Sequence, residues 1–366
     1  MLHSIQIRGY RSLREFRLKL GRVTIVTGGN GVGKSNVYRA LALLQRMAEG
    51  RFAEALAHEG GMPSALWAGK RRNDESKRIS WDIEHADFEF GIECGMVALG
   101  PESPSLFRTD PDIKNEKLLF SGKFMARRKG PVIEARNPDG KMESPSLPFH
   151  APESMISELR DGIRHPAVAA AREILLAWRF YHHFRTDADS PLRRPRLGSW
   201  SPVLAHDGSN LAATLQTIIE ASHGETLNAA IDSAFPGMEW SPVDDNGAFQ
   251  LCLQSPDLKR HMNAAELSDG TLRFFCLAAA LLSPKPPPLL VLNEPEASLH
   301  TGLIEPLAGL IAQVPRETQI LIVTHSQALA DSVIASCGAK KVELVAHDGE
   351  TRPKELAGSK RAWSFE

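Results

Sequence analysis

A glycine-rich run near the start of the chain constrains the fold more than any other stretch. Residues 28–35 read GGNGVGKS and fit G-x-x-x-x-G-K-[ST], the phosphate-binding P-loop. The run follows a β-type apolar segment, 23–26, and opens a helical one, 35–44. Glycines let the backbone wrap tightly and direct its N–H groups at phosphate oxygens, and the helix N-terminus adds a favourable dipole. The motif in this context predicts a nucleotide-binding α/β protein.

Two side chains of the run carry the predicted chemistry. Lys34 is expected to reach the β- and γ-phosphates of a nucleotide, and the Ser35 hydroxyl is expected to bind Mg²⁺. The other residues of this segment that we predict to contact the nucleotide are Gly28, Asn30, Gly31, Gly33 and Asn36.

A second apolar strand, far downstream, ends in acidic residues. Residues 289–296 read LLVLNEPE, which is typical of a Walker B strand whose end faces the metal and the γ-phosphate. A carboxylate at that place orients the attacking water or accepts its proton, and Glu294 is our candidate for this role. The alternative is an acid that only caps the next helix.

Two other segments fit the same nucleotide site. Ser268 and Gly270 precede the apolar helical run 272–280, where Ser268 is either a helix N-cap or a phosphate ligand, and the residues alone leave both open. His325 follows the apolar segment 320–323, and a histidine at such a strand end can sense the γ-phosphate. Most lone histidines have no such role, but this position favours one.

Composition limits the class of protein. The 366 residues contain 43 Lys and Arg against 44 Asp and Glu, a net charge of −1, which argues against a protein that coats nucleic acid. The four cysteines lie far apart without a C-x-x-C motif, so neither a zinc site nor a disulfide framework is indicated. No apolar run approaches the roughly 20 residues of a membrane span, and no signal-peptide pattern is present. We therefore expect a cytoplasmic protein with no membrane contact.

The order of predicted elements suggests a split core with an insertion. We expect an ATPase core at 1–58 and 207–346, a β-rich lobe and helical arm at 59–206, and a polar tail at 347–366. The final third alternates helices with short apolar strands, which favours a largely parallel sheet covered by helices. A helical block is predicted for 152–182, which places the sequence YHHF (181–184) at a helix end.

The motifs together resemble the ABC-type head ATPases, a class that includes RecF, the SMC proteins and the OLD-type ATPases, and in particular its compact bacterial members. The resemblance implies a P-loop NTPase fold that uses ATP and Mg²⁺. It implies an ABC signature at Ser268 and Gly270, a Walker B end at Asn293 and Glu294, a D-loop at 297–299, and a switch histidine at His325. Such heads close head to head into a dimer with two composite sites, so a homodimer is expected.

The sequence departs from this pattern at two positions. Asn293 stands where the family carries the aspartate that helps to bind Mg²⁺, together here with Ser35. The lost charge corresponds to about 4 kcal/mol for a pair 4 Å apart at an effective dielectric near 20, so weak Mg²⁺ binding or slow turnover is expected. Asp269 stands where transporter-type heads carry glycine. No convincing Q-loop glutamine is found, since nothing supports Gln216 in that role.

Three functions fit these observations. The first is an ATP-hydrolysing dimeric switch in DNA repair, recombination or phage defence. The second is an ATP-binding module with little turnover that controls a partner nuclease or another effector. The third is a small-molecule kinase, which the signature-like segment disfavours. DNA contact is open, because the basic clusters at 70–72 and 127–129 fit either solvated faces or phosphate contacts.

Overall fold

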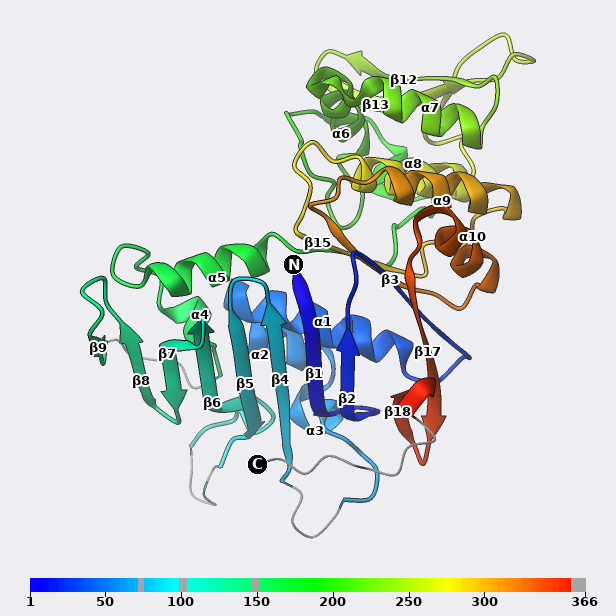
Figure 1. Ribbon diagram of the computed structural model, residues 1–366. Coiled ribbons are helices and arrows are strands. Elements are labelled where there is room, and N and C mark those ends of the chain that lie inside the picture. Colours follow the sequence, from blue (N-terminus) through cyan, green and yellow to red (C-terminus); the bar gives the residue numbers. More distant parts are fainter. Residues whose placement is uncertain (72–75, 99, 101–103, 146–151, 357–366) are drawn as a thin grey trace. The chain divides into compact units, whose positions relative to one another are not determined.

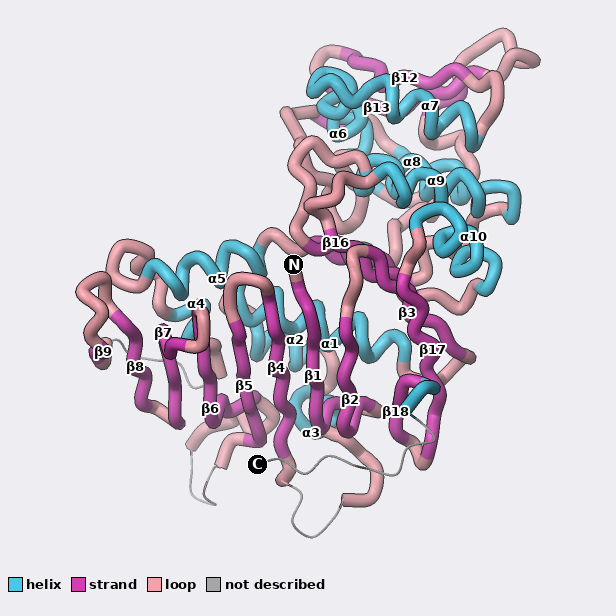
Figure 2. Tube along the Cα trace, in the orientation of Figure 1, coloured by secondary structure: helices cyan, strands magenta, loops and turns pink. Residues whose placement is uncertain are grey.

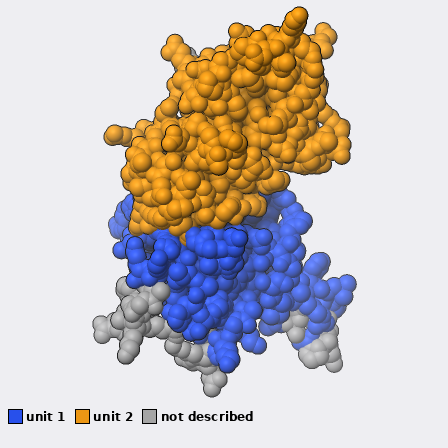
Figure 3. All heavy atoms as spheres, turned by 90° about the vertical axis from the view of Figure 1, so that its right-hand side faces the viewer, with its two compact units in different colours: residues 1–21, 28–178, 342–366 blue, residues 22–27, 179–341 orange. Residues whose placement is uncertain are grey.

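The chain divides into two compact units, coloured separately in Figure 3. The computed structural model describes residues 1–71, 76–98, 100, 104–145 and 152–356. Unit 1 contains residues 1–21, 28–178 and 342–366, and unit 2 contains residues 22–27 and 179–341. These boundaries lie elsewhere than those of the expected core and insertion, and that functional division stays a prediction.

Unit 1 contains an eight-stranded antiparallel sheet (Figures 1 and 2). Its order is β2-β1-β4-β5-β6-β7-β8-β9. The strands are β1 (Leu2–Tyr10), β2 (Leu13–Lys19), β4 (Arg78–His85), β5 (Glu89–Met96), β6 (Pro111–Phe120), β7 (Lys123–Lys129), β8 (Val132–Arg136) and β9 (Met142–Glu143). Because Ile5 of β1 pairs with Ile83 of β4, the first strands of the chain and those of the predicted lobe form one sheet.

Helices pack against this sheet. They are α1 (Lys34–Glu49), α2 (Phe52–His58), α3 (Gly61–Ala65), α4 (Met155–Glu158) and α5 (Pro166–Leu176). Alternate residues of β4 are buried, as expected for a strand with one covered face, and Trp81 is among them. Its ring meets the ring of Phe52 from α2 nearly edge-on, with centroids 6.0 Å apart. An aromatic contact therefore joins α2 to the sheet.

A C-terminal hairpin completes unit 1 and corrects one expectation. Strand β17 (Lys340–His347) pairs with β18 (Glu350–Pro353), and a 3₁₀ turn (Lys354–Leu356) follows. The sequence predicts a polar tail from residue 347, and β18 lies within it. Glu350 and Thr351 of this strand are nevertheless buried, and Glu350 forms an ion pair with Arg14 at 2.7 Å. The polar sequence of residues 350–353 alone therefore does not indicate that part of this strand is buried.

Unit 2 is built on four parallel strands in the order β10-β15-β16-β3. They are β3 (Val23–Gly28, through Thr27 in this unit), β10 (Arg179–Tyr181), β15 (Leu289–Asn293) and β16 (Gln319–Val323). All five residues of β15 and all five of β16 are buried, which explains their continuous apolar sequences. The predicted parallel sheet is confirmed.

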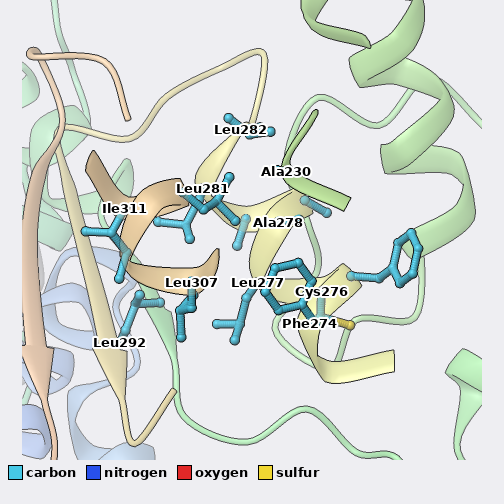
Figure 4. Packing of buried hydrophobic residues seen from close by; sticks show 14 of the residues in the cluster. Ala230, Phe274, Cys276, Leu277, Ala278, Leu281, Leu282, Leu292, Leu307 and Ile311 are labelled. Carbon is cyan, nitrogen blue, oxygen red and sulfur yellow. The ribbon is translucent and has the colours of Figure 1, made fainter. Parts of the chain in front are cut away.

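The helices of unit 2 bury one continuous core with these strands. They are α6 (Leu211–Ile218), a π-helical turn (Ile219–His223), α7 (Gly224–Ala234), α8 (Asp269–Leu281), α9 (Ile304–Gln313, after the 3₁₀ turn Thr301–Leu303) and α10 (Gln327–Cys337). Figure 4 shows Leu277 and Leu281 of α8 beside Leu307 and Ile311 of α9. A helix surrounded by apolar partners is fixed in position, so α8 provides a rigid base for the residues before it.

Short strands and one corrected helix complete the unit. The strands β11 (Arg196–Leu197), β12 (Glu239–Asp245), β13 (Ala248–Gln254) and β14 (Met262–Asn263) form a small antiparallel sheet, and a 3₁₀ turn spans Pro191–Arg193. The helical block predicted for 152–182 was wrong at its end, because α5 stops at Leu176 and β10 follows. A three-residue strand carries too little periodicity to be recognised.

Candidate functional site

The P-loop opens α1 as the motif predicts. The helix begins at Lys34 after Gly33, whose φ is +95° and which has no side chain to cap the first amides. Lys34 is buried, and its Nζ donates to the main-chain oxygens of Gly28 and Gly29, both at 2.8 Å. Ser35 and Asn30 are exposed. An uncapped helix end, a lysine folded back over its glycine loop and an open hydroxyl fit a triphosphate with its Mg²⁺.

A series of hydrogen bonds within unit 1 connects the P-loop to β18. Asn36 Nδ2 donates to Ser12 Oγ at 2.8 Å, Ser12 Oγ lies 2.6 Å from Thr351 Oγ1, and Thr351 donates to the carbonyl of Val32 at 2.7 Å. A Cβ on Gly33 would lie 2.0 Å from Thr351 Oγ1. The structure therefore uses the Asn36 side chain to brace the loop, and β18 lies directly against the glycine that the motif requires.

Asn293, Glu294 and His325 lie at one edge of the parallel sheet in unit 2. Asn293 and Val323 pair at the ends of β15 and β16, and Val323 pairs with Val26 of β3. Glu294 and His325 come just after these strand ends. Thr27 follows Val26 and is joined in the chain to Gly28, the first P-loop residue. The carboxyl ends of parallel strands are where α/β sheets bind ligands.

Asn293 is buried and forms a hydrogen bond with His182, which the sequence predicts at a helix end. Its Nδ2 donates to Nδ1 of His182 at 2.6 Å, so the neutral ring carries its proton on Nε2. His182 follows β10, where Tyr181 pairs with Leu292. Burial lowers the pKa of His182, and the charge of Glu294 acts in the opposite direction. The sequence predicts a helix end here, so it does not indicate that His182 follows a strand of the parallel sheet.

Two carboxylates flank His325. Its Nδ1 lies 3.6 Å from Glu294 Oε1 and 3.5 Å from Glu296 Oε1. Glu296 is buried and also accepts a hydrogen bond from the hydroxyl of Thr324. Glu294 is more exposed, and its backbone has a φ of +50°, rare for a residue with a side chain. Such a conformation at a strand end is typical of functional sites.

Buried polar atoms without partners mark the same edge. Thr27 Oγ1, Asn293 Oδ1 and Glu296 Oε2 find no hydrogen-bond partner among the described residues. Each such atom costs about 1–3 kcal/mol when left unpaired, so three close to the ends of adjacent strands call for a ligand, an ion or bound water. This edge therefore fits the metal-bearing end of a nucleotide.

The predicted signature and D-loop segments lie together in unit 2. Ser268 caps α8, with its Oγ accepting from the Thr271 amide at 3.1 Å, and its role as a phosphate ligand stays a prediction. A Cβ on Gly270 would lie 2.8 Å from the carbonyl oxygen of Ser298, which explains the glycine. A hollow of about 450 Å³ lies here and is lined by Ser268, Gly270, Thr271, Ser298 and His300, among others.

Other candidates lie elsewhere. Gln216 bonds Glu220 on the surface of α6, away from the strand ends. In the cluster 127–129, Arg128 is buried and donates to the Glu153 carbonyl at 2.6 Å, so that cluster presents no continuous basic face. Of the cluster 70–72, residue 72 lies outside the described residues. No group of three or more His, Cys, Asp or Glu side chains suited to a metal occurs in the described part of the chain.

The comparisons with known proteins agree with this geometry. The sequence profile of the family described as "AAA domain, putative AbiEii toxin, Type IV TA system" matches residues 23–331. No curated protein sequence matches the chain. Across the described ranges, no helix is long and apolar enough to cross a bilayer.

Several solved structures share the fold. An Smc head bound to the C-terminal winged-helix domain of ScpA superposes with a TM-score of 0.53 at 15% identity, over 97% of this chain and 99% of that one. The Pyrococcus furiosus Smc head bound to the ScpA C-terminal domain gives 0.51 at 14%, over 96% and 95%. The Pyrococcus yayanosii Smc head gives 0.52 at 11%, over 96% of each chain.

These findings confirm the predicted ABC-head type of P-loop NTPase fold. The family match spans the P-loop strand, the signature segment and the Walker B strand, and P-loop ATPases of this kind use ATP and Mg²⁺. The chain belongs to the family described as "AAA domain, putative AbiEii toxin, Type IV TA system", and its fold is similar to that of Smc heads.

Proposed function

We propose that this protein is an ATP-dependent switch in which two copies join head to head. The P-loop of one copy holds ATP, and the Ser268–Gly270 segment of the other closes over it. The observation that carries the proposal is the edge of the parallel sheet in unit 2. Buried polar atoms without hydrogen-bond partners within the residues that the structure describes lie there, and His325 lies between the carboxylates of Glu294 and Glu296. One strand of this sheet, β3, leads directly into the P-loop along the chain.

The side chains have distinct roles in this proposal. Lys34 and the first amides of α1 would hold the phosphates, and Ser35 with Asn293 would belong to the Mg²⁺ shell. Bound Mg²⁺ supplies charge that offsets the negative charge developing on the phosphate. Glu294 accepts the proton of the attacking water, and His325 contacts the γ-phosphate. Glu296 keeps His325 in place from the buried side.

ATP binding is strong enough to drive such a switch. A ligand present at 100 times its dissociation constant stabilises the bound state by about 2.7 kcal/mol, so two sites give about 5.4 kcal/mol. Moving an equilibrium from 1:99 to 99:1 takes about 5.5 kcal/mol. Two sites of this strength therefore suffice to convert a monomer population into dimers to the extent that the completed dimeric site binds ATP more tightly than the monomer does, because equal affinity for both states shifts nothing.

Sedimentation velocity with and without ATP and Mg²⁺ tests the proposal. Wild-type protein should dimerise with ATP, and Lys34→Ala should not. Glu294→Gln should stabilise the dimer and lower the hydrolysis rate by about 100-fold or more, the usual contribution of a general base. A wild-type chain that stays monomeric at every ATP concentration refutes the switch.

The buried amide of Asn293 favours a second candidate, a regulatory module with little turnover. An amide bonded to a neutral histidine supplies no charge to Mg²⁺. In this function the protein binds ATP and controls a nuclease or other effector. A steady-state hydrolysis rate no higher than that of Lys34→Ala, with ATP binding intact, would select the module over the switch.

We place either function in the cytoplasm, in phage defence or DNA repair. The family description names a toxin–antitoxin system, and solved Smc heads of the same fold are bound to a winged-helix protein, which supports a protein partner. Affinity purification from the native host with ATP or ADP, followed by mass spectrometry, tests this assignment. A partner retained equally with both nucleotides contradicts ATP control.

A further inference from the structure

One arginine binds the turn that precedes α8. Arg193 ends the 3₁₀ turn Pro191–Arg193, and its side chain is only 11% exposed. Its Nη2 donates to Asp269 Oδ1 at 2.6 Å, and its Nε donates to the carbonyl of Thr186 at 2.8 Å. Its Nη1 faces the carbonyl oxygens of Ala264 (3.2 Å), Ala265 (3.1 Å) and Leu267 (2.8 Å). We call residues 264–270 the signature turn.

The contacts demand the geometry of a guanidinium group. Arginine presents five N–H donors in a rigid plane, whereas lysine presents one compact ammonium group. Three carbonyls of one short turn reach a single Nη1 only when the turn has one backbone conformation. Arg193 is itself fixed, because Ser190 caps its 3₁₀ turn and Leu192 is buried. The Arg193 side chain therefore links the fixed 3₁₀ turn to the signature turn and restricts the conformation of the signature turn.

The ion pair also explains a departure from the resembled pattern. Asp269 stands where transporter-type heads carry glycine, and it supplies the carboxylate that Arg193 binds. It lies between Ser268, which caps α8, and Gly270, which packs against the Ser298 carbonyl. The residues that we propose to close over a second copy's ATP thus have their backbone fixed from the Arg193 side.

We propose that Arg193, with Asp269, is a positioning residue of the signature turn. It prepares Ser268 and the first turn of α8 for the nucleotide of a second copy, so that dimerisation does not have to order this segment. The proposal rests on the head-to-head switch proposed above. It assigns no role to Arg193 in nucleotide binding by the P-loop of its own copy.

Arg193→Ala in the full-length chain tests this role, with Arg194→Ala as the matched control. Arg194 is exposed, and its Nη2 donates to Asp189 Oδ1 at 3.2 Å. Arg193→Ala should bind ATP like wild type but need about tenfold more ATP, or more, for half-maximal dimerisation, since small misplacements at such sites have large effects. Amide hydrogen exchange at 264–272 should be at least about tenfold faster without ATP. Arg194→Ala should change neither quantity.

Conservative variants separate positioning from simple destabilisation. Asp269→Asn keeps the size of the side chain and removes only its charge, and should give a smaller defect of the same kind. Arg193→Lys should not restore dimerisation, because an ammonium group cannot serve all the acceptors. Wild-type exchange and dimerisation in Arg193→Ala would overturn the inference while leaving the switch intact. A wild-type protein that never dimerises would instead refute the switch, and the inference with it.

Discussion

Two glycines of the P-loop are constrained for different reasons. Gly31 and Gly33 both have positive φ, +77° and +95°, which a residue with a side chain adopts at a cost of about 1–2 kcal/mol. A Cβ on Gly31 would meet nothing within 4 Å, whereas one on Gly33 would overlap Thr351 and Ser12. Gly31→Ala should therefore lower the free energy of unfolding by only that backbone term, and Gly33→Ala by clearly more.

Chemical denaturation of the two variants without nucleotide measures this difference. Because both residues belong to the same loop, Gly31→Ala serves as the control for the backbone term. An equal decrease in the free energy of unfolding of the two variants would show that β18 moves to accommodate the added methyl group at no cost, contrary to the buried position of Thr351.

At the scale of single residues, the sequence identifies candidate site residues where a motif specifies them. It does not identify residues whose neighbours depend on which strands pair and in which register. Lys34, Glu294 and His325 could be named as candidates because motif spacing and strand ends define their positions, and their roles stay predictions. His182 was missed because its relation to Asn293 depends on the pairing of β10 with β15. Arg193 was missed because nothing in a sequence reports that one arginine meets three carbonyls of a distant turn.

At the scale of elements, β18 makes a testable contribution to the P-loop. Thr351→Val removes the hydroxyl that bonds both Ser12 and the Val32 carbonyl while keeping the shape of the side chain. The unpaired carbonyl should lower the free energy of unfolding by about 1–3 kcal/mol and weaken ATP binding. Thr351→Ser, which keeps the hydroxyl, should lose less of both. Calorimetric titration and denaturation provide the two measurements, and a fully stable Thr351→Val would contradict the bracing role.

The turn between β4 and β5 predicts a pH dependence of stability. His85 is buried, stacks on Phe88 with centroids 4.9 Å apart, and accepts from the Asp87 amide at 3.2 Å. Burial, aided by the nearby terminal amine, lowers the pKa of His85 to about 4, below its ordinary value of 6.5. The unfolded chain thus binds the proton more readily. Stability from this group is complete above pH 6.5 and is lost as the pH falls towards 4, by up to about 3 kcal/mol.

Denaturation midpoints between pH 7 and pH 4.5 check this sign. His85→Gln removes the titrating group but keeps an acceptor for the Asp87 amide, so its stability should fall less over that range. A wild-type protein that becomes more stable on acidification, relative to His85→Gln, would show that His85 is charged in the folded state.

The elements themselves were predicted where length or alternation was clear. The apolar segment 320–323 lies within β16, because four consecutive apolar residues between helical segments favour a buried strand. Strand β18 was not predicted, because its burial depends on ion pairs with Arg14 and Arg352 rather than on apolar side chains. The pairing of β1 with β4 could not be predicted either, because partners such as Ile5 and Ile83 are 78 positions apart and leave no local sequence pattern.

At the scale of the whole molecule, the proposed switch assigns the two parts of an active site to different chains. Lys34 belongs to unit 1, and Ser268 belongs to unit 2. If each site combines Lys34 of one copy with Ser268 of another, neither Lys34→Ala nor Ser268→Arg can form a complete site in its own homodimer. A mixed dimer contains one site that is defective twice and one site with both residues intact.

Mixing the two inactive variants in equal amounts should therefore restore ATP hydrolysis. Each mixed dimer has one of its two sites intact, so the activity should rise with protein concentration and reach at most about one half of wild type. The double variant Lys34→Ala/Ser268→Arg, mixed with either single variant, is the control and should stay inactive because no intact combination forms. A mixture as inactive as its components, formed from variants that still dimerise with wild type, would mean that each copy completes its own site.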